Sequence, residues 1–222
     1  MKQSSYLLQL SAIYTVCLVI SNIASNKLVD FFGFNIDGGF IFFPLTYVLN
    51  DIMTEVYGFK TARKVIWTAL FANIFTVCGL YLVINLPSSQ EWHHQKAFEQ
   101  VFDLSGRIFF ASLTSYLLGE MINSITLAKM KVYTEGLYMP FRFVASTIVG
   151  AALENSLFYF IAFYGVFDTS LILEMMTVQY ILKVLYEIAI LPVSCPLANY
   201  LKRKENIDYY DDKTKFDFLK IS

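Results

Sequence analysis

Long apolar stretches separated by short polar connections dominate the chain. A helix rises about 1.5 Å per residue and the hydrocarbon core of a bilayer is roughly 30 Å thick, so a spanning helix needs about 20 mostly apolar residues. Six windows meet this requirement, at about residues 5–28, 39–58, 62–86, 105–129, 141–166 and 170–200. The pattern predicts an all-α integral membrane protein with six transmembrane helices, which form one domain over residues 1–204.

The connection at residues 87–104 is the longest between two windows. Its apolar residues predict one face of a helix that lies in the membrane interface: Trp92, Phe98, Val101 and Phe102. Such a helix either rests passively on the surface or gates an outer entrance. His93 and His94 could bind a metal ion together with Glu91, but solvated histidines are much commoner in loops, so no metal site is expected.

The composition is typical of a membrane protein, because 56% of the 222 residues are hydrophobic and only 16% are charged. Thirteen of the 17 lysines and arginines fall on the side that would carry both termini, against three on the other side. Since short cytoplasmic loops carry the excess of positive charge, both termini are predicted to be cytoplasmic. The net charge of −1 leaves no basic stripe for nucleic acid, and three widely spaced cysteines suggest neither a disulfide framework nor a metal site.

The two ends of the chain carry different signals. The first window has one lysine before it and no small-residue cleavage site after it, so it is expected to stay as a helix and not to be removed as a signal peptide. Residues 205–222, ENIDYYDDKTKFDFLKIS, are polar and mixed in charge. We expect them to form a loosely ordered cytoplasmic tail.

Polar clusters recur in the two halves of the chain. The first predicted helix has SNIASNK and the fourth has GEMINSITLAK, while the second has NDIMTE and the fifth has LENS. With three helices in each half, the second half crosses the membrane in the opposite sense to the first. The pattern is compatible with two inverted three-helix repeats, an architecture in which substrate sites lie between the repeats.

Four of the predicted helices carry ionisable or amide side chains, spaced so that each set lines one face. An ionised side chain at the centre of a span costs roughly 2.5 to 3.5 kcal/mol, so these faces are expected to converge on the interior of the bundle. The candidate binding residues are Asn50, Asp51 and Glu55 in the second helix, Glu120 and Asn123 in the fourth, Glu154 and Asn155 in the fifth, and Lys183 and Glu187 in the sixth.

Some of these residues have a purely structural alternative. Lys183 and Glu187 stand four residues apart and could neutralise one another. Glu55, near the end of its helix, could be solvated or could pair with Arg63. The other acids have no basic residue within four positions on their own helices, so their partners must come from elsewhere.

The acids outnumber the one lysine inside the predicted spans. Either some of them carry a proton, or the ligand is a cation or a molecule with many hydrogen-bond donors. Aromatic residues lie close to the polar sets along the chain: Tyr47, Tyr57, Tyr116, Phe158, Tyr159 and Tyr186. Carboxylates and amides beside aromatic rings suit a planar heterocycle with many donors better than a sugar or a bulky lipid.

Four motifs in this order resemble the queuosine precursor transporter family, also called the vitamin uptake transporter family. They are FPLTYVLNDIMTEVYGFKTARKVIW in the second predicted helix, GEMINS in the fourth, STIVGAALENSLFYFIAF in the fifth and LKVLYEIAILP in the sixth. The resemblance runs from about Ser21 to Pro196. It implies a six-helix importer in the bacterial inner membrane, with residues 1–204 as the transporter domain and the nine candidate residues in its substrate pocket.

The same resemblance implies the substrate class: 7-cyano-7-deazaguanine, 7-aminomethyl-7-deazaguanine or queuine, which feed the queuosine modification of transfer RNA. Where other members have Asp or a small polar residue in the fifth helix, this chain has Glu154 and Asn155, which leaves the choice among the three compounds open. No cofactor is implied, and neither a homo-oligomer nor an energising partner is specified.

Three kinds of function remain open from the sequence. Secondary transport is favoured, because the chain has no phosphate-binding loop and a buried acid could couple substrate to a proton. A substrate-binding subunit of an energy-coupling-factor importer, which is of similar size, is the alternative. An intramembrane enzyme is not expected, because the chain has no His-Glu-x-x-His motif, nucleophile elbow or paired catalytic aspartates.

Overall fold

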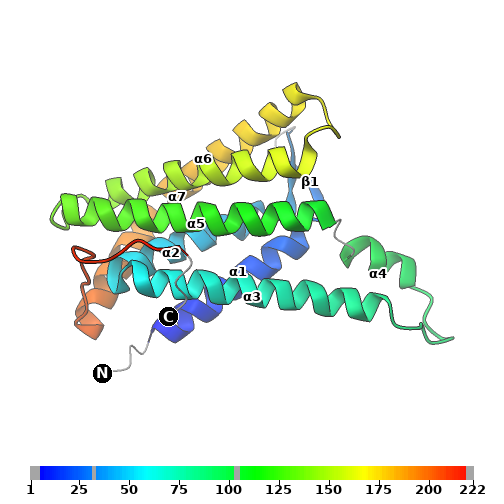
Figure 1. The fold of residues 1–222 in the computed structure, drawn as a ribbon, viewed down its shortest axis with the longest axis horizontal. Helices are drawn as coiled ribbons and strands as arrows, with labels where there is room; N and C mark the ends of the chain where they lie inside the picture. Colours follow the sequence, from blue (N-terminus) through cyan, green and yellow to red (C-terminus); the bar gives the residue numbers. More distant parts are fainter. Residues whose placement is uncertain (1–5, 32–33, 103–105, 219–222) are drawn as a thin grey trace.

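The helices form an elongated bundle with a β-hairpin near one end (Figure 1). The computed structural model describes residues 6–31, 34–102 and 106–218. The helices are α1 (Leu7–Ala24), η1 (Gly38–Ile41, a 3-10 helix), α2 (Phe43–Tyr57), α3 (Phe59–Ile84), α4 (Gln95–Phe102), α5 (Gly106–Tyr133), α6 (Met139–Phe163) and α7 (Thr169–Glu205). Strands β1 (Leu28–Phe31) and β2 (Phe34–Asp37) pair antiparallel.

We call the two ends of the bundle the hairpin end and the tail end. The hairpin end carries β1, β2, α4 and the connection from α6 to α7 (Figure 1). The tail end is the opposite one, where α1 begins and α7 finishes, and there the backbone N–H of Tyr6 donates to Glu205 (2.8 Å). The described ends of the chain therefore lie at the same end of the bundle.

Among the described residues, five helical segments are long and apolar enough to cross a membrane, and they contain α1, α3, α5, α6 and α7. The chain is therefore a multi-pass, all-helical membrane protein apart from its small hairpin. The window at 39–58 differs from the expectation, because α2 has only 15 residues and twelve of them are buried. At about 1.5 Å per residue it is roughly 22 Å long, which is too short to span a bilayer alone. A sixth span and the inverted repeats stay predictions.

The boundaries around α2 have local causes. The first helix finishes at Ala24, earlier than the window 5–28 suggested, because the hairpin begins at Leu28. Asp37 caps η1 by accepting the backbone N–H of Gly39 (3.0 Å), and Pro44 stands in the first turn of α2, where its missing N–H is not needed. Gly58, with a φ of 81°, makes the turn into α3.

α5 and α6 pack closely because small residues face one another. A Cβ atom on Gly119 would lie 2.6 Å from the Cβ atom of Glu154, and one on Gly150 would lie 3.0 Å from the carbonyl oxygen of Gly119. Helices in membranes associate through such close backbone approaches. This contact brings the polar residues of α5 and α6 next to each other and next to α2.

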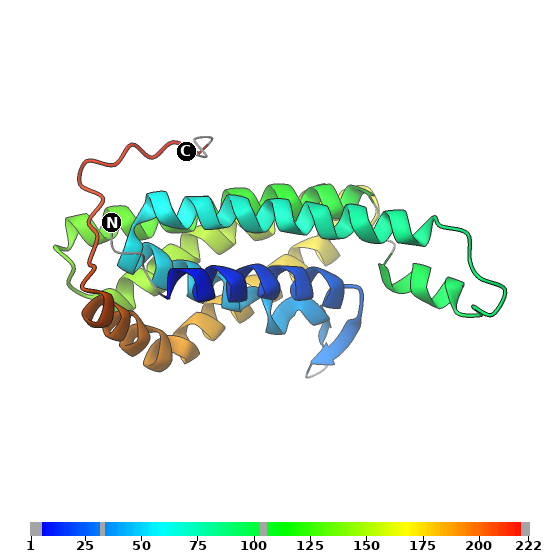
Figure 2. The same ribbon diagram turned by 90° about the horizontal axis from the view of Figure 1, so that it is seen from below.

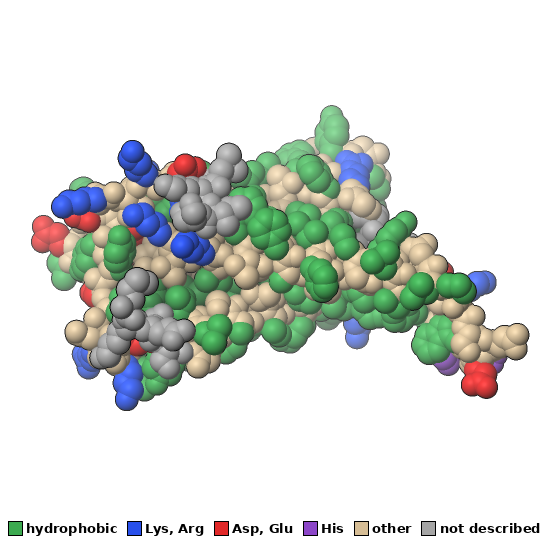
Figure 3. Space-filling view, turned by 60° about the horizontal axis from the view of Figure 1, so that its bottom comes forward, with side chains coloured by type: hydrophobic (Ala, Val, Ile, Leu, Met, Phe, Trp, Pro, Cys, Tyr) green, Lys and Arg blue, Asp and Glu red, His purple; other side chains and the backbone are tan. Residues whose placement is uncertain are grey.

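Basic residues gather at the tail end, on the first turns of α3 and the last turns of α5 and α7. In the view of Figure 3, most Lys and Arg side chains lie at this end and apolar side chains cover the middle of the molecule. The charge asymmetry noted in the sequence is thus an asymmetry between the two ends of the folded chain. That the tail end faces the cytoplasm stays a prediction.

The expected surface helix is present as α4, all eight residues of which are at least partly exposed. Trp92 and Phe98 are 6.4 Å apart between ring centroids and Phe98 and Phe102 are 4.8 Å apart, so three of the four predicted apolar residues pack together. His94 stacks edge-on against Trp92. Within the described ranges, no group of three His, Cys, Asp or Glu residues is arranged to hold a metal ion.

The tail is not loosely ordered in its described part, contrary to the expectation. From Ile207 to Phe218 it runs back along the tail end of the bundle (Figure 2), and its side chains Ile207, Phe216 and Phe218 pack against the hydrophobic core. The Trp67 indole N–H donates to the carbonyl oxygen of Phe218 (3.0 Å), and the ring of Phe216 packs 5.1 Å from that of Phe59. The polar composition suggested disorder, but aromatic residues spaced between the acids anchor the segment to the bundle.

The tail also caps a helix. The carboxylate of Asp211, 5% exposed, accepts the backbone N–H of Phe59 (2.8 Å), the first residue of α3. The first N–H groups of a helix have no partner within the helix, so this contact satisfies a buried donor.

Replacing Asp211 with Ala removes this capping contact and should lower the stability of the protein. Loss of a cap costs about 1 kcal/mol, which corresponds to a melting point about 2–4 °C lower for a chain of this size. Thermal unfolding in detergent measures the change. The neighbouring Asp212→Ala, which removes an exposed acid, is the matched control, and equal melting points for the two variants would contradict the assignment.

Candidate functional site

A cavity of about 590 Å³ opens at the hairpin end of the bundle. Its wall is built by the last turn of α1, by β2 and η1, by the start of α2, and by the halves of α5, α6 and α7 nearest the hairpin. The volume lies in the usual range for small-molecule sites. The charged and amide side chains in its wall are Asn22, Asn26, Asp37, Glu154, Asn155, Glu174, Gln179 and Lys183.

Three predicted residues meet at the floor of this cavity. Lys183 Nζ donates to Glu154 Oε2 (2.9 Å) and to Asn155 Oδ1 (2.7 Å). The Tyr47 hydroxyl, which lies outside the cavity wall, donates to the same Glu154 oxygen (2.8 Å). The Asn155 amide nitrogen is buried without a hydrogen-bond partner among the described residues, so the floor offers a donor as well as a carboxylate.

Lys183 does not pair with Glu187, so the structural alternative for these two residues is wrong. The spacing of four on α7 suggested the pair, but the lysine reaches across to α6 instead. Its ammonium group also lies 4.5 Å from the ring centroid of Phe43, at the start of α2. A buried cation that is held by a carboxylate, an amide and an aromatic ring is fixed in position.

A second polar group lies one helical turn nearer the hairpin. Gln179, four residues before Lys183 on α7, donates to Asp37 Oδ2 (2.8 Å), and the other oxygen of Asp37 accepts from Ser25 Oγ (3.0 Å). Sequence reasoning missed Asp37 because it stands in the hairpin, outside every predicted span core. Gln179 stands four residues before Lys183, so helical spacing places it on the same polar face of α7.

Aromatic rings form much of the remaining wall. Phe158 and Tyr159 meet edge-on at 5.3 Å between centroids, and Phe163 lies 5.9 Å from Tyr159. Phe158 and Tyr159 were expected near the polar sets and do line the cavity. Tyr47, Tyr57, Tyr116 and Tyr186 lie outside its wall. The cavity is thus lined by flat apolar surfaces above a polar floor.

Beneath the floor, a middle layer of acids lies inside the bundle and outside the cavity wall. Glu120 accepts from Thr46 Oγ1 (2.8 Å) and Asn50 Nδ2 (2.6 Å), and Asp51 accepts from Asn123 Nδ2 (2.5 Å). The third acid of the layer is Glu187, one turn beyond Lys183 on α7. We call Asp51, Glu120 and Glu187 the carboxyl layer. The predicted substrate residues Asn50 and Asn123 are therefore partners of these acids.

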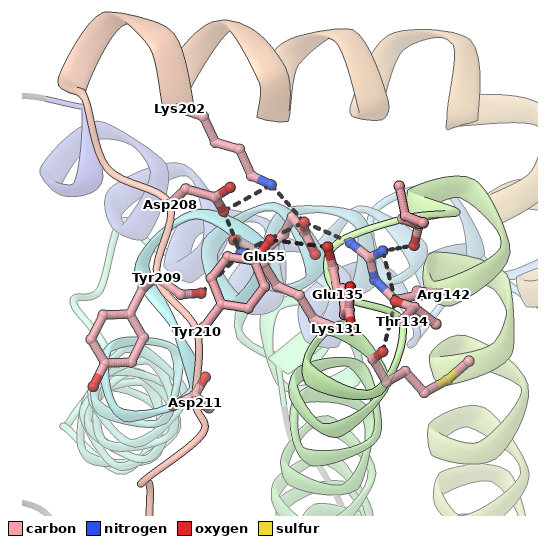
Figure 4. Close-up of polar contacts among 12 residues, drawn as sticks. Glu55, Lys131, Thr134, Glu135, Arg142, Lys202, Asp208, Tyr209, Tyr210 and Asp211 are labelled. Carbon is pink, nitrogen blue, oxygen red and sulfur yellow. Dashed lines mark hydrogen bonds and ion pairs between the residues drawn. The ribbon is translucent and has the colours of Figure 1, made fainter.

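Glu55 belongs to a third group, at the tail end (Figure 4). Its Oε1 atom accepts from Arg142 Nη2 (2.7 Å) and Lys202 Nζ (2.7 Å) and lies 3.7 Å from Lys131 Nζ. Asp208 of the tail bridges Lys131 (2.5 Å) and Lys202 (3.0 Å). We call these five residues the ion-pair cluster; it joins α2, α5, α6, α7 and the tail.

Both structural alternatives for Glu55 are wrong. The side chain is fully buried, so it is not a solvated end residue. Arg63 donates to the carbonyl oxygen of Asp217 in the tail (2.6 Å) and forms no ion pair with Glu55. The true partners come from helices far away in the sequence, which is why spacing along one helix did not reveal them.

Asp208 shows how strongly the cluster holds the tail. Partial burial alone would raise the pKa of this carboxyl, but the ammonium groups of Lys131 and Lys202 outweigh burial and hold the pKa below its usual value. The ion pairs of Asp208 are therefore intact at neutral pH and are lost only as the pH falls through that lowered pKa.

The chain matches a known protein family and several of its members. A family model described as "Putative vitamin uptake transporter" matches residues 37–196. The chain is 24% identical over 217 residues to the queuosine precursor transporter of Escherichia coli (strain K12), with 96% of this chain and 93% of that protein covered. It is 24% identical over 192 residues to the probable queuosine precursor transporter of Bacillus subtilis (strain 168), with 85% and 80% covered. No solved structure matches the chain significantly.

The matched residues include the cavity floor, the carboxyl layer and Glu55 of the ion-pair cluster. The match covers well over half of the chain, and the relatives are named as transporters and not as enzymes. The chain therefore belongs to the vitamin uptake transporter family, as the motifs of its second, fourth, fifth and sixth predicted helices indicated, and it is a transporter.

Proposed function

We infer that the chain imports 7-deazaguanine precursors of queuosine as a secondary transporter, and that the cavity at the hairpin end receives the substrate. The names of the relatives support the substrate class. The observation that carries the site is the floor, where Glu154, Asn155 and Lys183 meet beneath aromatic walls.

The floor matches the hydrogen-bonding edge of a 7-deazaguanine. The ring N–H and the exocyclic amine of this edge are donors, and the Glu154 carboxylate is an acceptor beside them. The ring carbonyl is an acceptor, for which the unpartnered Asn155 amide nitrogen is a donor. Phe158 and Tyr159 offer flat surfaces to the heterocycle. Because Glu120 and Asn123 lie outside the cavity wall, we assign them no direct contact in this state.

The two ends of the bundle support a direction of transport. The basic tail end would face the cytoplasm by the excess of positive charge in cytoplasmic loops, so the cavity would open to the outside. The ion-pair cluster then closes the inner side, and its partners on α2, α6 and α7 must separate for release. This arrangement fits import across the bacterial inner membrane.

Rescue of queuosine tests the function. The chain would be expressed alone in a bacterium that lacks precursor synthesis and its own importer but has the enzymes that use each compound. Queuosine in transfer RNA is then measured while each of the three compounds is supplied at low concentration. Rescue supports import by this chain alone. Failure of all three, with the protein shown in the membrane, would favour the alternative, a substrate-binding subunit that needs an energising partner.

Changing Glu154 to Gln should weaken uptake. The substitution replaces a charge-assisted acceptor with an amide, which costs about 1.5–3 kcal/mol or about 10- to 150-fold in apparent affinity. Uptake of labelled substrate at a range of concentrations measures the change. Glu91→Gln, in the exposed connection before α4, is the control. Unchanged affinity in a correctly inserted Glu154→Gln variant would exclude this floor as the binding site.

The charges in the cavity wall predict the preferred substrate. Three acids, Asp37, Glu154 and Glu174, face one base, Lys183, which Glu154 already neutralises. The surplus of negative charge favours the cationic 7-aminomethyl compound over the neutral 7-cyano compound.

Asp37 lies one turn above the floor, at a position suited to the 7-substituent. Asp37→Asn keeps an oxygen that accepts from Gly39 and Ser25, and Gln179 can turn its amide to accept from the new Nδ2. The loss of charge should reduce the preference for the amine by about fivefold, as expected for about 1 kcal/mol. Competition between the two compounds measures the ratio, with the exposed Asp212→Asn in the tail as the control. A ratio that is the same in Asp37→Asn and the unmodified chain would contradict the assignment.

A further inference from the structure

We propose that the carboxyl layer, Asp51, Glu120 and Glu187, binds the proton that drives transport. The inference rests on the proposed transport function and adds a site that is separate from the substrate cavity. Three observations carry it: the position of the layer, the absence of ion pairs from it within the described chain, and the buried, unpartnered carboxyl of Glu187.

Along the helices that contribute to it, the carboxyl layer lies between the cavity wall and the ion-pair cluster. On α2, Pro44 lines the cavity, Asp51 follows in the layer and Glu55 belongs to the ion-pair cluster. On α7 the order is Lys183, Glu187 and Lys202. An ion or proton that crosses the protein from the cavity toward the tail end must pass this level.

The acids of the layer make no direct ion pair with a described residue. Two other acids buried inside the bundle are neutralised, Glu154 by Lys183 and Glu55 by Arg142 and Lys202. In the part of the chain that the structure describes, none of the three acids in the layer forms an ion pair. Asp51 and Glu120 accept only from amides and hydroxyls.

Of the three acids, Glu187 has the fewest hydrogen-bond partners. Its side chain is 1% exposed, and neither carboxyl oxygen has a hydrogen-bond partner among the described residues. It lies within electrostatic reach of Asp51. An ionised carboxylate in a low-dielectric interior is expensive without a partner, and two adjacent ones are more so. A bound proton removes this cost.

The titratable groups that interact electrostatically with the layer include Tyr14 on α1, Tyr47 on α2, Tyr116 on α5, Glu154 on α6, and Lys183, Tyr186 and Cys195 on α7. Of these only Lys183 is a cation, and Glu154 and Asn155 already bind it.

The layer is connected to the substrate floor. Glu120 lies within electrostatic reach of both Glu154 and Lys183, so substrate that engages the floor changes the electric field at Glu120. A proton that arrives with substrate binds a carboxylate oxygen of the layer and leaves it toward the tail end when the ion-pair cluster opens. Proton relays in transporters use buried acids of this kind.

The test uses liposomes that contain the full chain, with the membrane potential clamped at zero. A gradient of one pH unit, alkaline inside, should drive about tenfold accumulation of labelled 7-aminomethyl-7-deazaguanine if one proton accompanies each molecule. A pH-sensitive dye inside should report acidification only when substrate is added. A sodium gradient at equal pH should drive no accumulation.

Glu187→Gln and Asp51→Asn each remove a proton site while keeping the shape of the side chain. Both should lose the accumulation driven by the pH gradient, whereas counterflow of labelled against unlabelled substrate, which needs no net proton movement, persists. Glu91→Gln should behave like the unmodified chain. If one variant fails to fold, the other variant and the dye signal from the unmodified chain still decide the question.

The outcomes separate the two claims. No counterflow by the unmodified chain for any of the three 7-deazaguanines would overturn the transport function itself. Counterflow without a response to the pH gradient, or accumulation driven by sodium instead, would overturn the proton site and leave the transport function standing. Gradient-driven accumulation by both variants and by Glu120→Gln would show that the proton binds outside the carboxyl layer.

Discussion

An ionised side chain inside a bilayer must find its partner within the protein, and the arrangement of this bundle follows from that constraint. The short helix α2 carries acids along its length, and twelve of its fifteen residues are buried. It is enclosed by α1, α3, α5 and α7, which supply the apolar faces toward the lipid. Five of its polar residues meet side chains from α5, α6 or α7, so these partners define the polar interior: Thr46, Tyr47, Asn50, Asp51 and Glu55.

Three levels result, and each has different chemistry. The cavity floor has a neutralised acid and lysine with an amide donor to spare, which suits a ligand that both donates and accepts. The acids of the carboxyl layer form no ion pair with any residue in the described ranges. The ion-pair cluster has one buried acid shared by three cations and joined to the tail through Asp208. A cavity at one end and ion pairs at the other are compatible with the alternating access that the proposed transport would use.

Sequence reasoning found the helices and most of the polar interior because hydropathy and helical spacing are local signals. It placed Glu154, Asn155 and Lys183 in one set, and they do meet at the floor of the cavity. It also grouped Asp51, Glu55, Glu120 and Glu187 with them, because spacing along one helix shows which face a residue occupies but not its depth in the bundle. The partners of Glu55 come from three other helices, which no single-helix pattern contains. Asp37 escaped notice because its position depends on the hairpin, and the order of the tail depends on Phe216 and Phe218 packing against residues about 150 positions earlier.

The most direct test of this account is the structure of the full chain with 7-aminomethyl-7-deazaguanine bound. The account predicts the ring between the aromatic walls, with its hydrogen-bonding edge on Glu154 and Asn155 and its amine toward Asp37. A ring bound instead among Asp51, Glu120 and Asn123, or outside the cavity, would contradict the division of the interior into a substrate floor and a separate carboxyl layer.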